Sequence, residues 1–580
     1  MAAPMVIDGP TTDRIRRLLL QNALEHDGVA RSGPVLARLL AIEPGLRPRR
    51  EELGVVVENL RIEVAALSPA AQASELARLG GPEPASASKS SSPEGEFPPL
   101  PGAETSPVVL RMAPFPSGAL HIGNGRMVFV NDYYRRRYGG KLLLVFDDTV
   151  GSLEKRVDPE MFDLILKDLE LLGARPDEVL YKSDRIPRHY PWARRLIEAG
   201  GAYVCRCEAE VLRTHRAEGR ECEHRNQTSG ETLELWEKML AGTFAPGEAV
   251  LRIRTDMHDP DPAFRDRVLF RISDLDHPRV GRKYRVWPLL EFSWAVDDVE
   301  LGITHVLRGK DLVMEDRMQE RIWQLLKVQG PPFLHWGLLR VREAKISKSK
   351  SYAEVQSGQY DGWADPRTWS FRSLDRRGIS PEATRRFTLS FGLSLADIEV
   401  PAETLYAENR ALIDATTPRR AFVEDPVRVD VAGYPGGLES VTLRNHPDQA
   451  DLGDRQVRAG PSFWLAGRDV RSRWGEEVRL KDLINVQLPP SPPVDRSPVD
   501  ATFTSRENKR IPRLQWVGLE GAAKVDLLGT EGEHRSGMGE AGLAIGRPRD
   551  IYQFERVGFV RLEADYRPGT LPVRVAFGHP

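Results

Sequence analysis

Two stretches near the start of the chain carry apolar residues at the spacing of amphipathic helices. They cover residues 12–24 and 34–41, in a segment rich in Leu, Ala, Glu and Arg. Apolar side chains that recur every three to four residues form one buried face of a helix. Residues 1–80 are therefore predicted to form a small helical module, and none of its patterns is typical of a catalytic site.

A run dominated by Gly, Pro, Ala and Ser follows this module. Such a composition buries too little apolar surface to offset the entropy of ordering the chain. Residues 81–106 are predicted to be a flexible linker.

From residue 107 the pattern alternates between short apolar strands and helices. Residues 107–110 and 141–146 have the pattern of buried strands, and residues 127–138 have helical spacing that Gly139 and Gly140 end. This alternation predicts an α/β fold with a doubly wound parallel sheet, in which ligands bind at the carboxyl ends of the strands.

The sequence pattern changes again towards the C-terminus. Residues 352–410 are predicted to be helical, and from about 418 short strands are separated by clusters of Pro, Gly and Asp, which is typical of all-β barrels. The predicted organisation is a module over 1–80, a linker over 81–106, an α/β domain over 107–350 with an insertion around 200–285, a helical subdomain over 351–417 and a β-barrel region over 418–580.

Composition limits the class of protein. The chain has 580 residues, of which 41% are hydrophobic and 29% charged, so three or more domains are expected. No apolar run approaches the roughly 18–20 residues of a membrane span, and no signal-peptide core is present, so a cytoplasmic location is expected. A net charge of −2 argues against coating of nucleic acid, although a local basic face is enough to bind one.

The turn between the strand at 107–110 and the helix at 127–138 has the features of a phosphate site. Free N–H groups and the helix dipole favour an anion at a helix N-terminus. Gly118 and Gly123 let backbone and ligand approach closely, and His121 can donate to a phosphate oxygen. The alternative is an ordinary strand–turn–helix connection.

A second candidate stretch covers residues 344–350. Its two serines and three lysines can wrap a polyphosphate. A basic loop on its own is usually only a solvated surface, so the stretch gains weight from the first candidate upstream.

Charged residues stand at the ends of two predicted strands. Asp147 and Asp148 follow the strand at 141–146; they either cap the next turn or hold the ammonium group of an amino acid. Arg308 ends an apolar segment that begins at Leu301. Its planar fork suits a carboxylate, and a surface salt bridge is the alternative.

All three cysteines lie close together and argue against a disulfide framework. Cys205, Cys207, Cys222 and His224 form a C-x-C and C-x-H pair, a plausible tetrahedral zinc set with no open catalytic position. Such a site would be structural. The alternative is buried small residues with His224 on the surface, since the usual spacing is C-x₂₋₄-C.

Both candidate loops resemble known signatures. His121-Ile-Gly-Asn124 and Lys345-Ile-Ser-Lys-Ser349 resemble the His-Ile-Gly-His and Lys-Met-Ser-Lys-Ser motifs of class I aminoacyl-tRNA synthetases. Together with segments 146–149, 302–308 and 362–367, they make the chain similar to archaeal-type glutamyl-tRNA synthetases, which share their architecture with glutaminyl-tRNA synthetases.

The resemblance covers about 107–425 well, and residues 416–427 resemble the family's entry into its anticodon-binding barrels. It implies a Rossmann-like catalytic domain with an inserted acceptor-binding subdomain, followed by a helical subdomain and anticodon-binding barrels. Over residues 1–100 it rests mainly on position.

The resemblance also implies a two-step reaction. Glutamate would attack the α-phosphorus of ATP, Mg²⁺ would accompany the pyrophosphate, and the terminal ribose of the tRNA would then attack glutamyl-adenylate. His121, Asn124, Lys345 and Lys348 would act on the phosphates through position and charge. The implied ATP-binding residues are Pro114, Gly118, His121, Gly123, Asn124, Lys345, Ser347, Lys348 and Ser349.

Three residues match the family's amino-acid site. Arg111 would meet the substrate carboxylate, Asp147 its α-ammonium group, and Arg308 would favour glutamate because glutamine would leave a buried guanidinium unpaired. The chain departs from the family at Asn124, where the signature has His. Phe115 and Leu290 also replace a common polar residue and a common Tyr, so part of the pocket is remodelled.

Three other interpretations stay open at this stage. A glutaminyl-tRNA synthetase is the nearest, and Arg308 disfavours it. A small-molecule nucleotidyltransferase would not need the β-rich region after residue 418. A non-catalytic, tRNA-binding scaffold is the third. The sequence also leaves open whether tRNA(Gln) is charged, whether zinc is bound and whether the N-terminal module docks to a protein partner.

Overall fold

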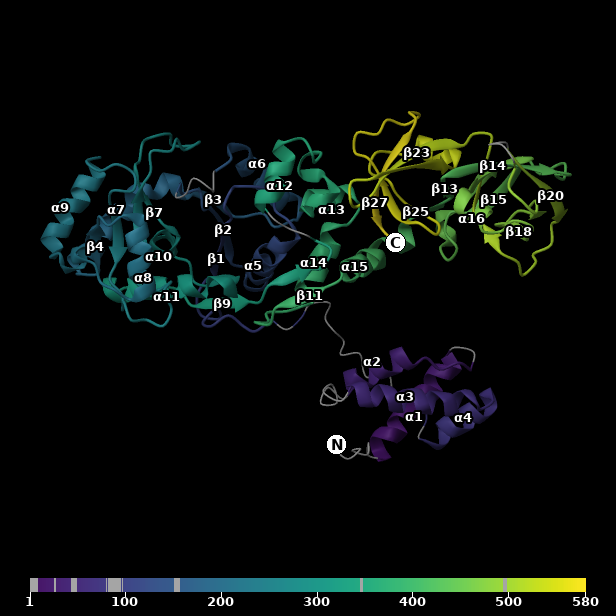
Figure 1. The fold of residues 1–580 in the computed structure, drawn as a ribbon, viewed down its shortest axis with the longest axis horizontal. Coiled ribbons are helices and arrows are strands. Elements are labelled where there is room, and N and C mark those ends of the chain that lie inside the picture. Colours follow the sequence, from purple (N-terminus) through teal and green to yellow (C-terminus); the bar gives the residue numbers. More distant parts are fainter. Residues whose placement is uncertain are drawn as a thin grey trace. The chain divides into compact units, whose positions relative to one another are not determined.

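The computed structural model describes residues 9–25, 28–42, 50–79, 81, 95, 97–150, 157–344, 348–493 and 498–580. The chain divides into two compact units, residues 1–93 and 94–580. Figure 1 follows the chain from the purple helices of the first unit to the yellow strands of the second. None of the helices in these described ranges is long and apolar enough to cross a membrane.

The first unit is a helical module, as the sequence predicts. It consists of α1 (Gly9–Glu25), α2 (Ser32–Ile42), α3 (Arg50–Ala65) and α4 (Pro69–Arg78). The apolar faces of α1 and α3 meet through Ile15, Leu19 and Val57, all fully buried. Helix α4 begins with Pro69, and the Ser68 side chain accepts a hydrogen bond from the Ala71 N–H, which stabilises a helix N-terminus.

The second unit begins with a parallel sheet. Strands β1 (Val109–Met112), β2 (Lys141–Phe146) and β3 (Glu178–Tyr181) pair in the order β1-β2-β3. The parallel pair β8 (Val306–Gly309) and β9 (Phe333–Trp336) joins the edge of β1 through Thr304, whose N–H donates to the Val109 carbonyl. Strand β1 starts two residues later than predicted, because Pro107 has no N–H for the ladder.

Helix α5 (Gly125–Tyr138) connects β1 to β2 and ends as predicted. Gly139 adopts a φ of 61°, and its N–H bonds back to the carbonyls of Arg135 and Arg136. A left-handed residue with this bonding pattern is the usual end of a helix and favours Gly.

Residues 97–106 differ from the prediction, which assigned them to the flexible linker. Phe97 and Leu100 are buried in the core of the α/β domain. The Phe97 ring lies 4.3 Å from the ring of Tyr133, and the Tyr134 hydroxyl donates to the Pro98 carbonyl. The prediction rests on the average composition of the whole segment, which hides the two apolar residues Phe97 and Leu100.

An antiparallel sheet lies in the stretch predicted as an insertion. Its strands β4 (Ala202–Cys205), β5 (Val250–Ile253), β6 (Val268–Ile272) and β7 (Val286–Pro288) pair in sequence order. Their buried faces share a hydrophobic core with the helices around them. Figure 1 draws these strands and helices in blue to teal. The α-helices of this part of the chain are α6 (Pro159–Leu171), α7 (Lys182–Glu198), α8 (Ala209–Glu218), α9 (Ser229–Leu240), α10 (Leu290–Glu300) and α11 (Val313–Leu326).

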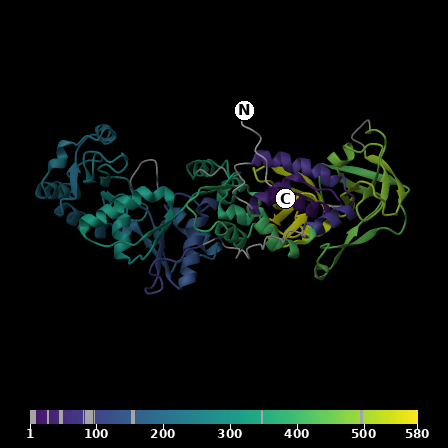
Figure 2. The same cartoon turned by 90° about the horizontal axis from the view of Figure 1, so that it is seen from below.

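Four helices and a short parallel pair lead to the C-terminal region. The helices are α12 (Lys348–Gln356), α13 (Phe371–Arg376), α14 (Pro381–Leu389) and α15 (Glu403–Ile413), and the pair is β10 (Leu339–Val341) with β11 (Ile398–Val400). Two seven-stranded sheets follow, as the predicted barrels require. Figures 1 and 2 both show them side by side, and Ala421, Val423 and Val517 are buried together where β13 and β22 meet.

One sheet has the order β12-β25-β26-β27-β23-β24-β13, and its two edge strands are consecutive in the chain. The other has the order β21-β18-β19-β20-β14-β17-β22, with β15-β16 as a separate hairpin and α16 (Gly467–Arg471) after β17. The strands are β12 (Arg419–Arg420), β13 (Phe422–Glu424), β14 (Pro426–Ala432), β15 (Ser440–Arg444), β16 (Asp454–Arg458), β17 (Ser462–Ala466), β18 (Glu477–Leu480), β19 (Asn485–Gln487), β20 (Val499–Ser505), β21 (Arg513–Leu514), β22 (Trp516–Gly518), β23 (Ala523–Leu528), β24 (His534–Gly539), β25 (Ile551–Phe554), β26 (Gly558–Leu562) and β27 (Val573–His579).

Candidate active site

The loop before α5 is a compact, internally bonded turn. The His121 N–H donates to the Asn124 side-chain oxygen at 3.1 Å, and the His121 Nδ1 accepts from the Gly123 N–H at 3.1 Å. Neutral His121 therefore carries its proton on Nε2. Asn124, the departure from the usual signature, supports the turn through its side-chain oxygen.

The same loop is bonded to the helical subdomain. The Ile122 N–H donates to the Trp369 carbonyl, and the Phe371 N–H donates to the Leu120 carbonyl. Asp168 of α6 accepts from the Leu120 N–H at 3.0 Å and pairs with Arg372 of α13 at 2.6 Å. Burial raises the pKa of Asp168 to about 6, against the opposing effect of Arg372.

Gly118 has a packing role that the sequence did not reveal. A Cβ atom there would lie 2.8 Å from the indole of Trp363, which belongs to the segment 362–367. A side chain at position 118 would collide with the Trp363 ring, so Gly118 contributes to packing within the chain. Its predicted closeness to a ligand stays a prediction. Pro114 lies at the end of β1, and its carbonyl accepts the Asp147 N–H.

The lysine-rich loop falls partly outside the described residues. Lys345 and Ser347 are not described. Lys348 and Ser349 begin α12, and only their backbone is described.

Four charged residues meet at the carboxyl ends of the parallel strands. Arg111 lies in β1, Asp147 follows β2, Lys182 follows β3, and Arg308 lies near the end of β8. The three residues predicted to bind the amino acid are thus brought together. Lys182 was not predicted, although the rule that ligands bind at the carboxyl ends of strands would have pointed to it.

Each cation of this cluster has a carboxylate partner. Arg111 makes a two-pronged pair with Asp298, Lys182 lies 3.0 Å from Asp147, and the Nε of Arg308 donates to Asp316 at 2.7 Å. Lys182 also donates to the Ser293 hydroxyl, and Arg308 donates to the Gln319 side chain at 2.6 Å. The four charged residues at the strand ends are each at least nine-tenths buried: Arg111, Asp147, Lys182 and Arg308.

Burial and partners act in opposite directions on these groups. Burial lowers the pKa of Lys182 more than Asp147 raises it. Burial and the neighbouring Arg111 likewise lower the pKa of Arg308, against the effect of Asp316. Burial alone would lower the pKa of Arg111, but Asp298 outweighs it and the pKa rises.

Two hydrogen-bond donors in this cluster have no acceptor among the described residues. They are the Nη1 of Arg308 and the Nε1 of Trp294, which lies on α10. Both side chains are only 5% exposed. A buried donor without an acceptor costs about 1–3 kcal/mol, so these two donors are available to a ligand with acceptor oxygens.

The four predicted metal ligands also come together. Their ligand atoms lie within 4.8 Å of one another, with 3.9 Å between the sulfurs of Cys205 and Cys222 and 3.5 Å between the Cys207 sulfur and the His224 Nδ1. Tetrahedral zinc with thiolate bonds of 2.3 Å separates its ligand atoms by about 3.8 Å, so the residues fit this ion. The guanidinium of Arg252 donates to the sulfurs of Cys205 and Cys222.

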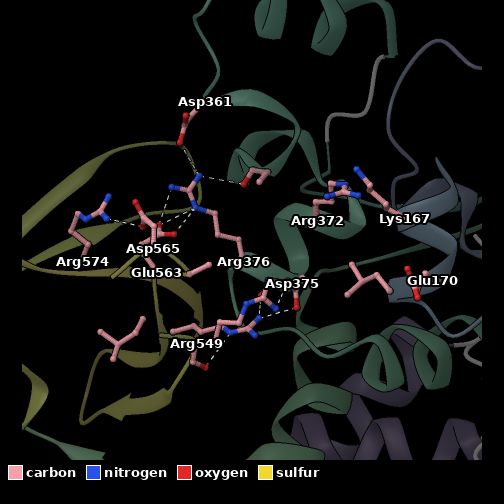
Figure 3. Close-up of a pocket in the computed structure, with 15 residues that line it drawn as sticks. Lys167, Glu170, Asp361, Arg372, Asp375, Arg376, Arg549, Glu563, Asp565 and Arg574 are labelled. Carbon is pink, nitrogen blue, oxygen red and sulfur yellow. Dashed lines mark hydrogen bonds and ion pairs between the residues drawn. The ribbon is translucent and has the colours of Figure 1, made fainter. Parts of the chain in front are cut away.

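A separate cavity of about 610 Å³ lies between α13 and the loop after β26 (Figure 3). Its arginines are engaged with acids: Arg376 with Glu563, Arg561 with Asp375, and Arg574 with Asp565. None of the predicted site residues lines it. Its size alone therefore does not identify the active site.

Comparison with known families agrees with this arrangement. Residues 107–414 match the model of the catalytic domain of class I tRNA synthetases (E and Q), and residues 417–491 match the model of their anticodon-binding domain. The chain belongs to the class I tRNA synthetases of the E and Q type. The predicted fold class is thereby confirmed.

Relatives of this family align with nearly the whole chain. A glutamate–tRNA ligase of Methanothrix thermoacetophila is 38% identical over 95% of this chain and 98% of its own length. A glutamate–tRNA ligase of Methanopyrus kandleri is 39% identical over 98% of this chain and 99% of its own length.

Among solved structures, a glutamate–tRNA synthetase of Elizabethkingia anophelis is 21% identical. It covers 53% of this chain and 71% of its own, with a TM-score of 0.38. That overlap is too low to support an argument, so the assignment rests on the sequence matches.

Proposed function

We propose that the chain is an ATP-dependent glutamate–tRNA ligase that attaches glutamate to tRNA(Glu). The assignment draws on the family match, on the names of the relatives, and on one structural observation that carries it. Arg308 is a buried guanidinium at the carboxyl edge of the sheet with one nitrogen left without an acceptor. A carboxylate fills that vacancy as an ion pair, whereas the amide oxygen of glutamine can accept the bond but brings no opposite charge.

Each predicted site residue then has a role. His121 and Asn124 shape the loop that takes the ATP phosphates, and the backbone at Gly118 and Gly123 lies beside them. Lys345 and Lys348, with Ser347 and Ser349, stabilise charge on the phosphates as the glutamate carboxylate attacks the α-phosphorus. Mg²⁺, when bound, neutralises the departing pyrophosphate. Asp147 holds the α-ammonium group, and Arg111 and Arg308 attract the carboxylates.

Pyrophosphate exchange tests this function. Exchange of labelled pyrophosphate into ATP is measured with glutamate and with glutamine, each with and without tRNA(Glu). Exchange with glutamate alone supports the proposal. Exchange with glutamine instead would move the chain to the glutaminyl side of the family, and no exchange under any of the four conditions would favour a non-catalytic role. Charging of tRNA(Gln) transcripts in the same preparation decides whether that tRNA is also a substrate.

We also propose a structural zinc ion on Cys205, Cys207, Cys222 and His224. The short separations of the ligand atoms support it, and the positive Arg252 offsets the negative charge of a three-thiolate site. Elemental analysis should find one zinc per chain in the wild type and less than one fifth of that in Cys222→Ser. Wild-type protein that contains no zinc and takes up none on titration would contradict the proposal.

The domain limits follow the same scheme. We propose a module over 1–80, an α/β domain with its insertion up to 350, a helical subdomain over 351–417 and barrels over 418–580. Within the predicted linker, residues 97–106 are reassigned to the α/β domain because Phe97 and Leu100 belong to its core.

A further inference from the structure

Trp294 occupies an unusual position in the charged cluster. Three cations lie over its ring, with Arg111 at 4.8 Å, Lys182 at 4.9 Å and Arg308 at 5.0 Å from the ring centroid. Cations over an indole ring are attracted by its π electrons, more strongly when the site excludes water. These contacts hold the ring in one orientation.

The indole N–H of Trp294 has no acceptor in the described part of the chain, unlike that of its neighbour Trp323. Trp323 on α11 is equally buried, and its Nε1 donates to the Ala295 carbonyl at 2.8 Å. A buried indole normally finds such a partner. The guanidinium of Arg308 lies over the Trp294 ring, with its carbon 5.0 Å from the ring centroid, and has an open donor of its own.

Two adjacent donors match a carboxylate better than an amide. A carboxylate offers two acceptor oxygens, so one can bond to each donor. The glutamine amide has one acceptor oxygen and an NH₂ group, which would face a donor. The pair of donors therefore discriminates between the two amino acids by hydrogen-bond direction as well as by charge.

We propose that Trp294 is a specificity-determining residue, and that its Nε1–H donates to the side-chain carboxylate of the amino acid substrate next to Arg308. The inference rests on the proposed glutamate–tRNA ligase function. It adds a substrate contact that neither the sequence motifs nor the family match assigns.

The test replaces Trp294 by Phe, which keeps an aromatic ring for the three cations and removes the N–H. Pyrophosphate exchange with saturating tRNA(Glu) should show a rise of about tenfold or more in the KM for glutamate. The KM for ATP should stay within about twofold, and the preference for glutamate over glutamine in kcat/KM should fall. Trp323→Phe is the matched control: it should lower the melting temperature and leave both KM values within about twofold.

A KM for glutamate that is unchanged in Trp294→Phe would overturn the inference, as would equal rises in the KM values for glutamate and ATP. A wild type that exchanges nothing with glutamate would instead remove the proposed function. A second measurement avoids mutation: in wild-type protein with ¹⁵N-labelled tryptophan, saturating glutamate should shift one indole N–H resonance that glutamine leaves in place. No responding indole resonance would contradict the contact.

Discussion

Two arginine-rich regions of the second unit differ in how their charges are satisfied. In the cavity of Figure 3, Arg574 pairs with the exposed Asp565 within the barrel, and Arg376 of α13 pairs with the exposed Asp361 and with the nearly buried Glu563 of the barrel. Around Trp294, the cations are nearly fully buried, and two donors stay without an acceptor. The charged pairs of the cavity are partly solvated, whereas the charged groups of the cluster are buried.

Among the described residues, buried donors without an acceptor also occur on Arg126, Arg252 and Arg377, so the cluster is distinguished by two such donors together with convergent charged side chains. Cavity size and the number of charges favour the region of Figure 3. Unmet hydrogen-bonding capacity under burial favours the cluster at the carboxyl ends of β1, β2, β3 and β8. A buried polar group without a partner costs free energy, whereas an exposed group bonds to water. Buried donors without an acceptor are therefore more informative than cavity size.

The largest effect is expected from Arg308→Met. It removes the charge that meets the substrate and leaves Asp316 without its arginine partner. Truncating one partner of a buried charge pair costs about 2–5 kcal/mol of binding, which is about 30- to 4,000-fold in kcat/KM for glutamate. Pyrophosphate exchange measures it. Arg308→Lys keeps the positive charge but loses the planar guanidinium, so its kcat/KM for glutamate should lie between those of the wild type and Arg308→Met. Equal activity of Arg308→Met and the wild type would exclude a role for this residue.

The second-largest effect is expected on the free energy of unfolding, when the buried ion pair between Lys182 and Asp147 is broken. Lys182→Met leaves the carboxylate of Asp147, at the buried edge of the sheet, without its ion pair. We expect the free energy of unfolding to fall by about 3–5 kcal/mol, as for other broken buried pairs. Denaturant unfolding followed by tryptophan fluorescence gives the value. A loss below about 1 kcal/mol would mean that Asp147 and Lys182 are solvated like a surface pair.

The pH dependence of stability tests Asp168, which links the His121 loop to α13. Burial raises its folded pKa to about 6, above the ordinary aspartate value of 3.8, so the folded state takes up a proton first as pH falls. This group therefore adds about 1 kcal/mol of stability as pH drops from 7 to 5, and that gain is lost again as pH rises through 6. Asp168→Asn should lack the gain. Unfolding of both proteins at pH 7 and pH 5 measures it, and a wild-type minus variant difference that is the same at both pH values would refute it.

The smallest effect is expected from Arg574→Met in the cavity of Figure 3. Arg574 and its partner Asp565 are 45% and 71% exposed, and exposed pairs contribute less than about 1 kcal/mol. Melting temperature and pyrophosphate exchange should both stay close to the wild type. A strong loss of exchange with unchanged stability would show that this cavity takes part in the reaction, and would undo the comparison.

Most of the fold follows from patterns that local chemistry controls. The spacing of apolar residues predicts α5 and β2 to within two residues, and the Gly139 end of α5 follows from its left-handed backbone. The packing of Phe97 depends on neighbours distant in the sequence, such as Tyr133, so composition alone could not give it.

The site was predictable where a motif fixes the chemistry. Arg111, Asp147 and Arg308 meet as expected, and the metal ligands converge despite an uncommon spacing. Lys182 and Trp294 were missed because a lysine at a helix start and a tryptophan in an apolar helix have no special pattern in sequence. Their roles arise only when four strand ends and α10 come together.

The most direct test of the central claim is a charging competition. Purified protein is given ATP, a tRNA(Glu) transcript, and glutamate and glutamine at equal concentration, and the amino acid released from the tRNA is identified by mass spectrometry. The account predicts glutamate as the dominant product, and a strong reduction of that product with Arg308→Met. Glutamine on the tRNA, or glutamate charging that does not depend on Arg308, would contradict it.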